Sequence, residues 1–135
     1  MSLQQSVAVR NARLDAIEAA IGAGAILKLR TGAVPASCAA ADSGTVVATL
    51  NLPADWMQAA AGGTKAKAGT WEDTSADAAG TVAHFRIYAA DGTTCHLQGT
   101  VTISGGGGDM TLDNTNVTAG QAITISAFSI TAGNA

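Results

Sequence analysis

The sequence is poor in charge, in aromatic side chains and in long apolar runs. Charged residues make up 13 % of the chain, about half the usual share, and aromatic residues make up 4 %. Lysine and arginine form no cluster and the formal net charge is −3, so the basic stripe that follows a nucleic acid backbone is missing. No apolar run approaches the roughly 20 residues of a membrane-spanning helix, and the N-terminus lacks the order of a secretory signal. We therefore expect neither a nucleic acid nor a membrane partner.

Motifs of known chemistry are missing as well. The cysteines Cys38 and Cys95 lack the C-x-x-C spacing of redox and zinc sites, and whether they pair with each other stays open. There is no G-x-S-x-G elbow, no phosphate-binding glycine loop and no carboxylate pair on facing elements. Asp109 and Asp113 suit turn capping better than a Ca²⁺ loop. We therefore expect a protein that is not an enzyme, with no catalytic residue, no cofactor and no metal site.

The chain is rich in small residues. Hydrophobic residues reach 47 %, much of it alanine, and there are 16 glycines. A soluble chain with so little charge and so much alanine is typical of a subunit in a larger assembly, although alanine-rich loops would give the same statistic. At 135 residues the chain is long enough for one domain with a real core.

A β-hairpin from Thr81 to Ile103 is the clearest element. Apolar and polar residues alternate on both sides of its turn, which is the period of a half-buried strand. A three-residue loop at residues 90–92 keeps the apolar residues of both strands on one face, with Ile87 opposite Cys95. We expect that loop, with Gly92 in the left-handed region and Cys95 facing the core.

The other face of this hairpin carries the one polar row that resembles a functional surface. We expect the row to be exposed, as a candidate contact surface together with Trp71, which either covers an open end of the core or makes an outside contact. Two histidines in the row are poor metal ligands, because an arginine lies between them and a third ligand is not evident. The members of the row are His84, Arg86, Tyr88, His96 and Gln98.

The N-terminal stretch from Ser2 to Ile21 predicts the one convincing helix. Its apolar residues recur at spacings of four and three, as in a heptad seam, and glycines follow it. Two interpretations stay open: the helix lies on its own sheet, or it packs against copies of itself or a neighbouring protein. The seam, our candidate assembly interface, consists of Leu3, Val7, Arg10, Leu14, Ile17 and Ile21.

The rest of the chain reads as short strands between glycine-rich turns. We expect strands at residues 25–30, at 45–52 and around 67–71, with one or two helical turns over 54–61. The last strand, 122–131, changes its apolar parity near Ala127, which predicts a β-bulge, a bend from one sheet to the other, or burial on both faces. The whole pattern predicts a mainly β fold: an antiparallel β-sandwich, Ig-like or jelly-roll-like, over residues 25–135, with an N-terminal docking helix over 1–24.

Almost the whole chain resembles a group of small proteins of tailed bacteriophages and prophages. The stretches that carry the resemblance are NARLDAIEAAIGA, ATLNLPADWM, KAKAGTWEDTSADA, GTVAHFRIYAADGTTCHLQGTV and GDMTLDNTNVTAGQAITISAFSIT. These motifs are strands and turns, so the resemblance transfers no catalytic residue. The tetraglycine at 105–108 is longer than the corresponding loops of the group, which suggests a local role for that tip.

The resemblance implies a non-enzymatic virion structural protein. Its expected place is a head-, neck- or tail-associated building block or decoration, assembled in the cytoplasm of the bacterial host. Its expected partners are copies of itself, with a trimer as one stoichiometry, and other virion proteins. The alternative is a glycan- or receptor-binding module displayed on the virion, in which Tyr88, Trp56 or Trp71 stacks on a sugar.

Overall fold

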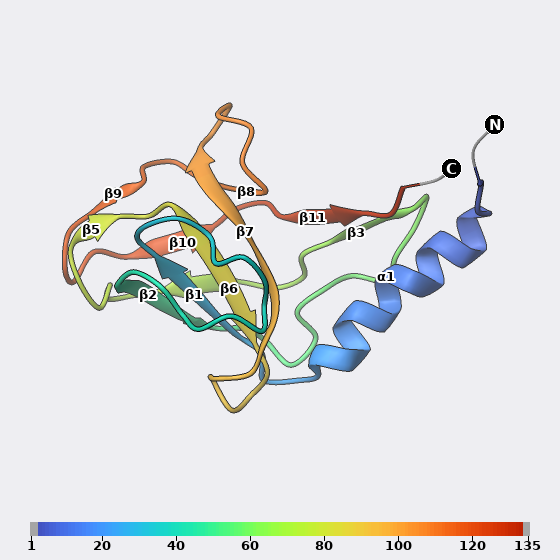
Figure 1. Ribbon diagram of the computed structural model, residues 1–135, viewed down its shortest axis with the longest axis horizontal. Coiled ribbons are helices and arrows are strands. Elements are labelled where there is room, and N and C mark those ends of the chain that lie inside the picture. Colours follow the sequence, from blue (N-terminus) through green and yellow to red (C-terminus); the bar gives the residue numbers. More distant parts are fainter. Residues whose placement is uncertain (1–2, 134–135) are drawn as a thin grey trace.

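Five strands form the main sheet of the protein in the order β2-β1-β6-β7-β8 (Figure 1). The structure is a computed structural model that describes residues 3–133. Neighbouring strands of the main sheet run antiparallel, except that β8 runs parallel to β7. The bounds of these strands are Ile26–Arg30 (β1), Val46–Asn51 (β2), His84–Tyr88 (β6), Cys95–Ile103 (β7) and Met110–Leu112 (β8).

Three two-stranded ribbons complete the β structure. They pair β10 with β4, β11 with β3, and β5 with β9. The strands are Thr64–Ala66 (β3), Trp71–Asp73 (β4), Gly80–Thr81 (β5), Asn116–Val117 (β9), Ile123–Ile125 (β10) and Ser129–Thr131 (β11). Main sheet and ribbons bury one continuous core between them, to which Leu27 and Ile87 contribute from one side and Ile123 and Ile125 from the other. The predicted mainly β sandwich with one N-terminal helix is confirmed.

The core is centred on a chain of aromatic rings. Trp71 lies between Trp56 and Phe128, with ring centroids 6.0 and 5.7 Å away, and Phe128 meets Phe85 edge-on at 5.6 Å. Such tilted and edge-on pairs stabilise beyond the area they bury. Trp71 is fully buried, so our placement of it on a contact surface is wrong, and the alternative that it closes the core is correct.

The hairpin of β6 and β7 turns Phe85, Ile87 and Leu97 toward the core as predicted, but at a different register. Ile87 lies opposite Leu97 rather than Cys95, and Phe85 lies opposite Gly99. A bulge beside Ile87 moves Cys95 opposite Tyr88, so Cys95 does not face the core. The loop is also longer by one residue, because Ala89 and Thr94 pair across it. Gly92 does take the left-handed conformation, with φ of 70°.

The tetraglycine run explains how β8 returns parallel to β7 over so short a connection. Parallel neighbours usually need a crossover of a dozen residues or more, but here residues 104–109 suffice. Gly105 and Gly107 adopt positive φ values of 85° and 81°, which other residues disfavour. The chain therefore doubles back and places Met110 beside Val101.

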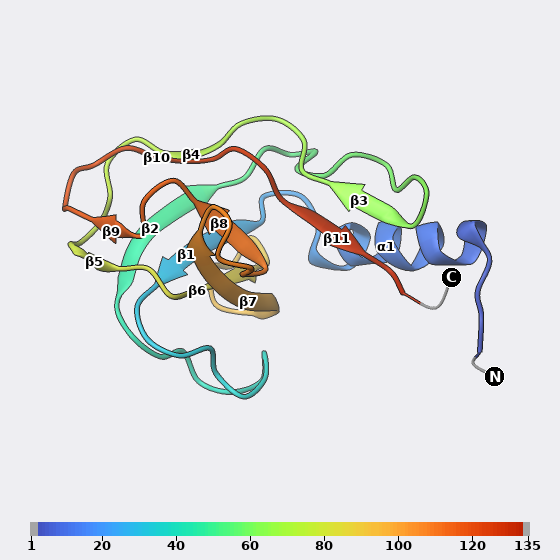
Figure 2. The ribbon, with the colours of Figure 1, turned by 90° about the horizontal axis from the view of Figure 1, so that it is seen from above.

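The helix α1, Val7–Ile21, forms an arm together with β3 and β11 that projects from the sheets (Figures 1 and 2). Ser6 caps its start, where the hydroxyl accepts the N–H of Val9 over 3.2 Å. Gly22 ends it at φ 87°, and its N–H bonds to the carbonyl of Glu18. The helix thus begins five residues later than the sequence predicts; Ser2 lies outside the described residues.

Two further expectations differ from the structure. The segment 54–61 has no helical turn and instead makes single β-bridges at Met57 and Ala61, because Trp56 and Met57 are drawn into the core. The last strand bends between ribbons, which was one of three alternatives: β10 pairs with β4 and β11 pairs with β3. That bend resolves the change of parity near Ala127.

Candidate functional site: a polar network beneath the 31–44 loop

The polar row expected to be exposed on the hairpin is largely buried. His84 and Tyr88 have no exposed surface and Arg86 is 1 % exposed, so our expectation for these three is wrong. The reason is the loop of residues 31–44, which folds back across this face of the sheet and hydrogen-bonds to it. Gln98 is half-buried and only His96 is exposed.

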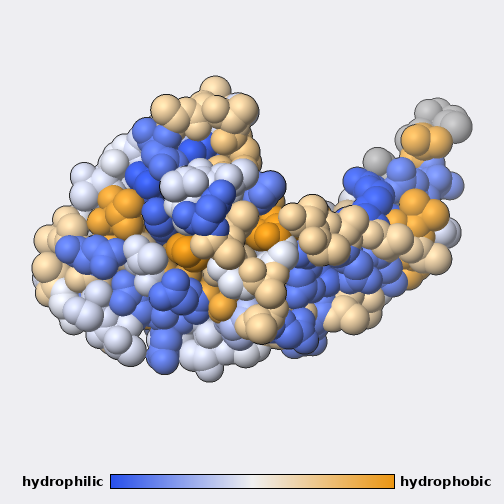
Figure 3. Space-filling model, turned by 90° about the horizontal axis from the view of Figure 1, so that it is seen from below, coloured by the Kyte–Doolittle hydropathy of each residue, from blue (hydrophilic) through white to orange (hydrophobic). Residues whose placement is uncertain are grey.

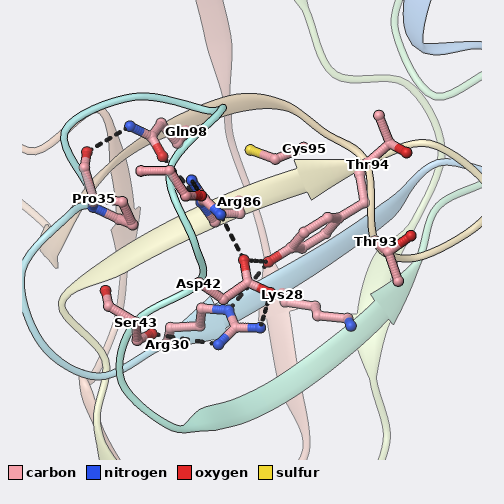
Figure 4. Close-up of polar contacts among 12 residues, drawn as sticks. Lys28, Arg30, Pro35, Asp42, Ser43, Arg86, Thr93, Thr94, Cys95 and Gln98 are labelled. Atoms are coloured by element: carbon pink, nitrogen blue, oxygen red, sulfur yellow. Dashed lines mark hydrogen bonds and ion pairs between the residues drawn. The ribbon is translucent and has the colours of Figure 1, made fainter.

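Asp42 of this loop is the centre of the network (Figure 4). Its Oδ1 accepts hydrogen bonds from Arg86 Nη1 over 2.5 Å and from the Tyr88 hydroxyl over 2.7 Å. Its Oδ2 accepts from Arg30 Nη2 over 3.1 Å. The side chains of both arginines are almost fully buried, at 7 % and 2 % exposure, whereas that of Asp42 is 40 % exposed. One carboxylate therefore pairs with two cations that have little access to water.

Arg86 holds the loop at several further points. Its Nη2 donates to the carbonyls of Ser37 and Ala40, over 2.8 and 3.1 Å. Its Nε donates to Gln98 Oε1, and the amide of Gln98 donates in turn to the carbonyl of Pro35. Four of the five guanidinium donors therefore bind protein groups. The arrangement fastens a loop to a sheet and leaves Arg86 little capacity for a ligand.

The charges of the network shift its ionisation equilibria. Burial works to raise the pKa of Asp42, but the hydrogen bonds from Tyr88 and Arg86 and the arginine charges outweigh it and lower that pKa. Burial and the bond to Asp42 raise the pKa of Tyr88. Burial works to lower the pKa of Arg86, but the bond to Asp42 and further electrostatic effects of its neighbours together outweigh burial and raise that pKa. At neutral pH the network consists of a carboxylate, two guanidinium ions and a neutral phenol.

His84 lies next to this network and is incompletely paired. Its Nδ1 is 2.8 Å from the carbonyl of Gly32, which can only accept, so Nδ1 carries the proton. Its buried Nε2 has no partner among the described residues. Burial lowers the pKa of His84, an effect that the charges of Arg30 and Arg86 reinforce. The side chain of His84 is therefore a neutral imidazole, buried where the 31–44 loop covers the main sheet.

A cavity of about 600 Å³ opens beside the network, between the loop and the hairpin turn. Both cysteines line it, and burial together with the neighbouring Cys38 raises the pKa of the Cys95 thiol to about 12. A thiol held in its protonated form is a weak nucleophile and a weak metal ligand. The pocket therefore brings Cys38 and Cys95 together without activating Cys95.

The helix seam is divided between the protein's own core and its surface. Leu14 and Ile21 are buried, and Ile17 packs against the core. Arg10 is half-buried and its Nη1 donates to the carbonyl of Ala132. Leu3 and Val7 are exposed. The intramolecular interpretation thus holds for the seam from Arg10 to Ile21, while Leu3 and Val7 are exposed on the outside of the arm.

Ion pairs fix the C-terminal half of α1 to β3. Lys65 is 2 % exposed, and its Nζ lies 2.7 Å from Asp15 and 3.0 Å from Glu18. The other oxygen of Glu18 accepts the N–H of Met57 over 3.2 Å. The burial of Lys65 could not be predicted, because a lysine in a linker-like stretch gives no sign that it will be buried.

Apolar side chains remain exposed on the outer part of the arm, and the two that belong to the predicted seam, Leu3 and Val7, are called the apolar patch. Leu3, Val7 and Val9 are 69 %, 47 % and 48 % exposed. Elsewhere in the described chain only Ile103 is a comparably exposed large hydrophobic residue. Val9 lies two residues from Val7, on another side of the helix, and does not belong to this patch.

The aromatic residues offered for sugar stacking do not form a platform. Trp56, Trp71 and Tyr88 each have no exposed surface, and stacking on a sugar requires an open ring face. The glycan-binding alternative therefore loses the side chains on which it rested.

Comparisons with known proteins add no assignment: no family model, no curated protein and no solved structure matches the chain. Within residues 3–133, no helix is both long and apolar enough to cross a membrane.

Proposed function

We propose that this protein is a non-enzymatic structural subunit of a tailed-bacteriophage virion, present in several copies as a head-, neck- or tail-associated component. The observation that carries the proposal is the apolar patch of Leu3 and Val7, exposed on an arm that projects from the β body. Such a patch on a projecting element is a natural contact for a neighbouring subunit.

Three further features support this proposal. The chain resembles phage and prophage proteins over almost its whole length. Its charged content of 13 % is low for a protein that meets only water. Its buried polar groups fasten a loop and a helix to the sheets and form no nucleophile–base arrangement, which favours a scaffold over an enzyme.

The decisive experiment is to find the protein in particles. Virions are purified from a strain whose prophage encodes this chain, and the protein is quantified by mass spectrometry relative to the major capsid protein. We expect a fixed, multiple copy number per particle and density for the β body in a cryo-EM reconstruction. Purified infectious particles that lack the protein would overturn the proposal.

Variants of the patch test the role of the arm. Leu3→Asp combined with Val7→Asp should reduce incorporation into particles at least tenfold and leave the folded body intact by circular dichroism. Ala12→Asp combined with Ala16→Asp serves as the control, because it adds the same two charges at exposed positions of the helix outside the patch. Equal incorporation of both variants would assign assembly to another surface.

A further inference from the structure

Two strand edges face each other without partners where the main sheet meets the arm. The outer edge of β7 pairs with β8 only over Val101–Ile103, so its first residues have no neighbouring strand on that side. β11 pairs with β3 on one side and with no strand on the other among the described residues. Both edges belong to the recess between the sheet and the arm.

The main-chain groups on these edges point outward. In an antiparallel pair, alternate residues bond to the partner strand and the others point away. On β7, the N–H of Val101 donates to the carbonyl of Ala83, the residue before β6. The main-chain groups of Thr100 and Gln98, in the alternate positions, therefore point away from β6. The carboxylate of Asp109 takes the N–H of Thr100 over 2.9 Å. The main-chain N–H and carbonyl of Gln98 are left without a strand partner among the described residues.

The main-chain groups of β11 alternate in the same way. The carbonyl of Phe128 accepts from Lys67, and the N–H of Ala132 donates to Gly63, both across the ribbon with β3. Ser129 and Thr131, in the alternate positions, therefore present their N–H and carbonyl groups to the open side. Two rows of main-chain donors and acceptors thus border one slot.

The slot contains a hollow of about 250 Å³ with an apolar floor. An extended strand with one apolar side chain turned inward fits such a site. Its main chain can pair with the two open edges while the side chain fills the hollow, as in strand addition to an open sheet. The hollow is lined by Phe85, Leu97, Gln98, Asp109, Phe128, Ser129, Ile130 and Thr131.

Apart from Thr100, whose N–H the Asp109 carboxylate binds, these edges lack the usual protection against pairing. Natural edge strands are guarded by lysine, proline or inward charges. The sequences CHLQGTVTI of β7 and SIT of β11 contain no lysine, no proline and no carboxylate. An unguarded pair of edges in a folded protein indicates that a strand covers them in the assembled state.

We propose that the slot receives the extended segment Leu3–Ser6 of a second copy of this chain, with the Leu3 side chain in the hollow. This inference rests on the proposed multimeric function and names the contact that builds the multimer. Leu3–Ser6 has no secondary structure of its own and carries no charge. Leu3 is the most exposed large hydrophobic side chain of the described residues, at 69 %.

The segment belongs to a neighbour because the arm holds it away from its own body. The ion pairs of Lys65 and the bond of Arg10 to Ala132 fix α1 along the arm. The N-terminal end of the helix then lies at the outer end of the arm (Figures 1 and 2). The space-filling view shows the arm projecting beyond a concave outline of the body (Figure 3), so a second copy has open access there.

Site-specific cross-linking between two differently labelled copies tests the contact. In a background with Cys38→Ser and Cys95→Ser, one copy carries Leu3→Cys and the other carries Thr131→Cys. We expect a disulfide-linked heterodimer when the two are mixed under a low-molecular-weight disulfide, at least tenfold above the yield with Val9→Cys in place of Leu3→Cys. Yields equal to that control overturn the inference.

Light scattering separates failure of this contact from failure of the proposed function. Leu3→Asp, which needs no change in the slot, should dissociate the multimer, and Thr131→Pro, which removes an outward N–H, should do the same. A multimer that persists in Leu3→Asp overturns the strand contact and leaves the multimeric subunit standing. A wild-type protein that is monomeric at all concentrations and absent from purified particles overturns both.

Discussion

Arg86 Nη1 donates to Asp42 Oδ1 over 2.5 Å, which joins the middle of the main sheet to a loop 44 positions earlier in the chain. Removing that carboxylate leaves the buried guanidinium groups of Arg86 and Arg30 without an anion. Loss of one partner from a buried pair costs about 3–5 kcal/mol. Because the Asp42 side chain is 40 % exposed, solvent screening reduces the loss.

We therefore expect Asp42→Asn to lower the free energy of unfolding by about 2 kcal/mol. Urea denaturation measures the change, and limited proteolysis within residues 31–44 should become faster. Asp113→Asn, at an exposed turn, serves as the control and should change stability by less than about 0.5 kcal/mol. Equal stability of the two variants would show that Asp42 does not hold the loop.

Tyr88 offers a direct optical probe of the same network. It is the only tyrosine of the chain, and burial together with its bond to Asp42 raises its pKa. Asp42→Asn removes a negative charge that opposes ionisation, so the Tyr88 pKa should fall toward the ordinary value of a tyrosine. Absorbance near 295 nm during an alkaline titration reads this out. An unchanged titration curve would contradict the contact.

His84 makes folding sensitive to pH below about 6.5. Burial lowers its pKa in the folded state, and Arg30, Arg86 and Asp42 are the charged groups around it. The unfolded chain binds a proton as the pH falls through about 6.5, whereas the folded chain resists it. Stability contributed by the neutral imidazole is therefore complete above that pH and declines below it.

The variant His84→Gln should flatten this decline. Its amide can still donate to Gly32, but it binds no proton in this range. Stability is measured by urea denaturation at intervals from pH 7.5 to 5 for wild type, His84→Gln and the control His96→Gln, whose side chain is exposed on β7. If His96→Gln removes the decline of stability with falling pH and His84→Gln does not, the pH dependence comes from His96 and the prediction is wrong.

The sequence predicts strands well where apolar and polar side chains alternate along them. Alternation in the hairpin gave the inward side chains of Phe85, Ile87 and Leu97 correctly. The predicted register was wrong because a slip of two residues leaves every side chain on the same face of the strand, so the alternation of apolar and polar residues does not change. A bulge and a four-residue loop then decide between the two registers, and neither leaves a mark in the alternation.

The candidate site was harder to predict, because the partner of the polar face is a loop. Arg86 and Tyr88 alternate with apolar residues as exposed side chains do. Nothing in the stretch TGAVPASCAAADSG indicates that Asp42 will meet them. Burial of β6 on both faces arises from long-range contacts, which periodicity within a strand cannot report. The helix seam was predicted in position, but its division between core and surface depends on where Lys65 lies.

Lys65 anchors α1 to the arm through its ion pairs with Asp15 and Glu18. Lys65→Ala removes the buried cation and should loosen the helix, with a loss of about 2 kcal/mol once the exposure of the two carboxylates is discounted. Hydrogen exchange should accelerate in α1 while β6 stays protected. Lys67→Ala, two residues along the chain, is the control. Unchanged exchange in α1 would show that apolar contacts alone dock the helix.

Gly44 closes the 31–44 loop at a position where a side chain has no room. Its φ is 69°, and a Cβ there would overlap the carbonyl oxygen of Thr31. The two ends of the loop are joined at this point, where the N–H of Thr31 donates to the Thr45 carbonyl over 3.1 Å and the N–H of Thr45 donates to the Thr31 hydroxyl over 2.9 Å.

Gly105 provides a control with the same backbone strain, since its φ is 85° and nothing lies near the position of a Cβ. Gly105→Ala should cost about 1 kcal/mol from its left-handed conformation alone. Gly44→Ala carries that cost plus the displacement of Thr31, so we expect about 3 kcal/mol. It should also shift the Tyr88 titration in the direction of Asp42→Asn, because the loop that carries Asp42 would move. If both alanine variants lose the same stability, closure at Thr31 does not hold the loop over the sheet.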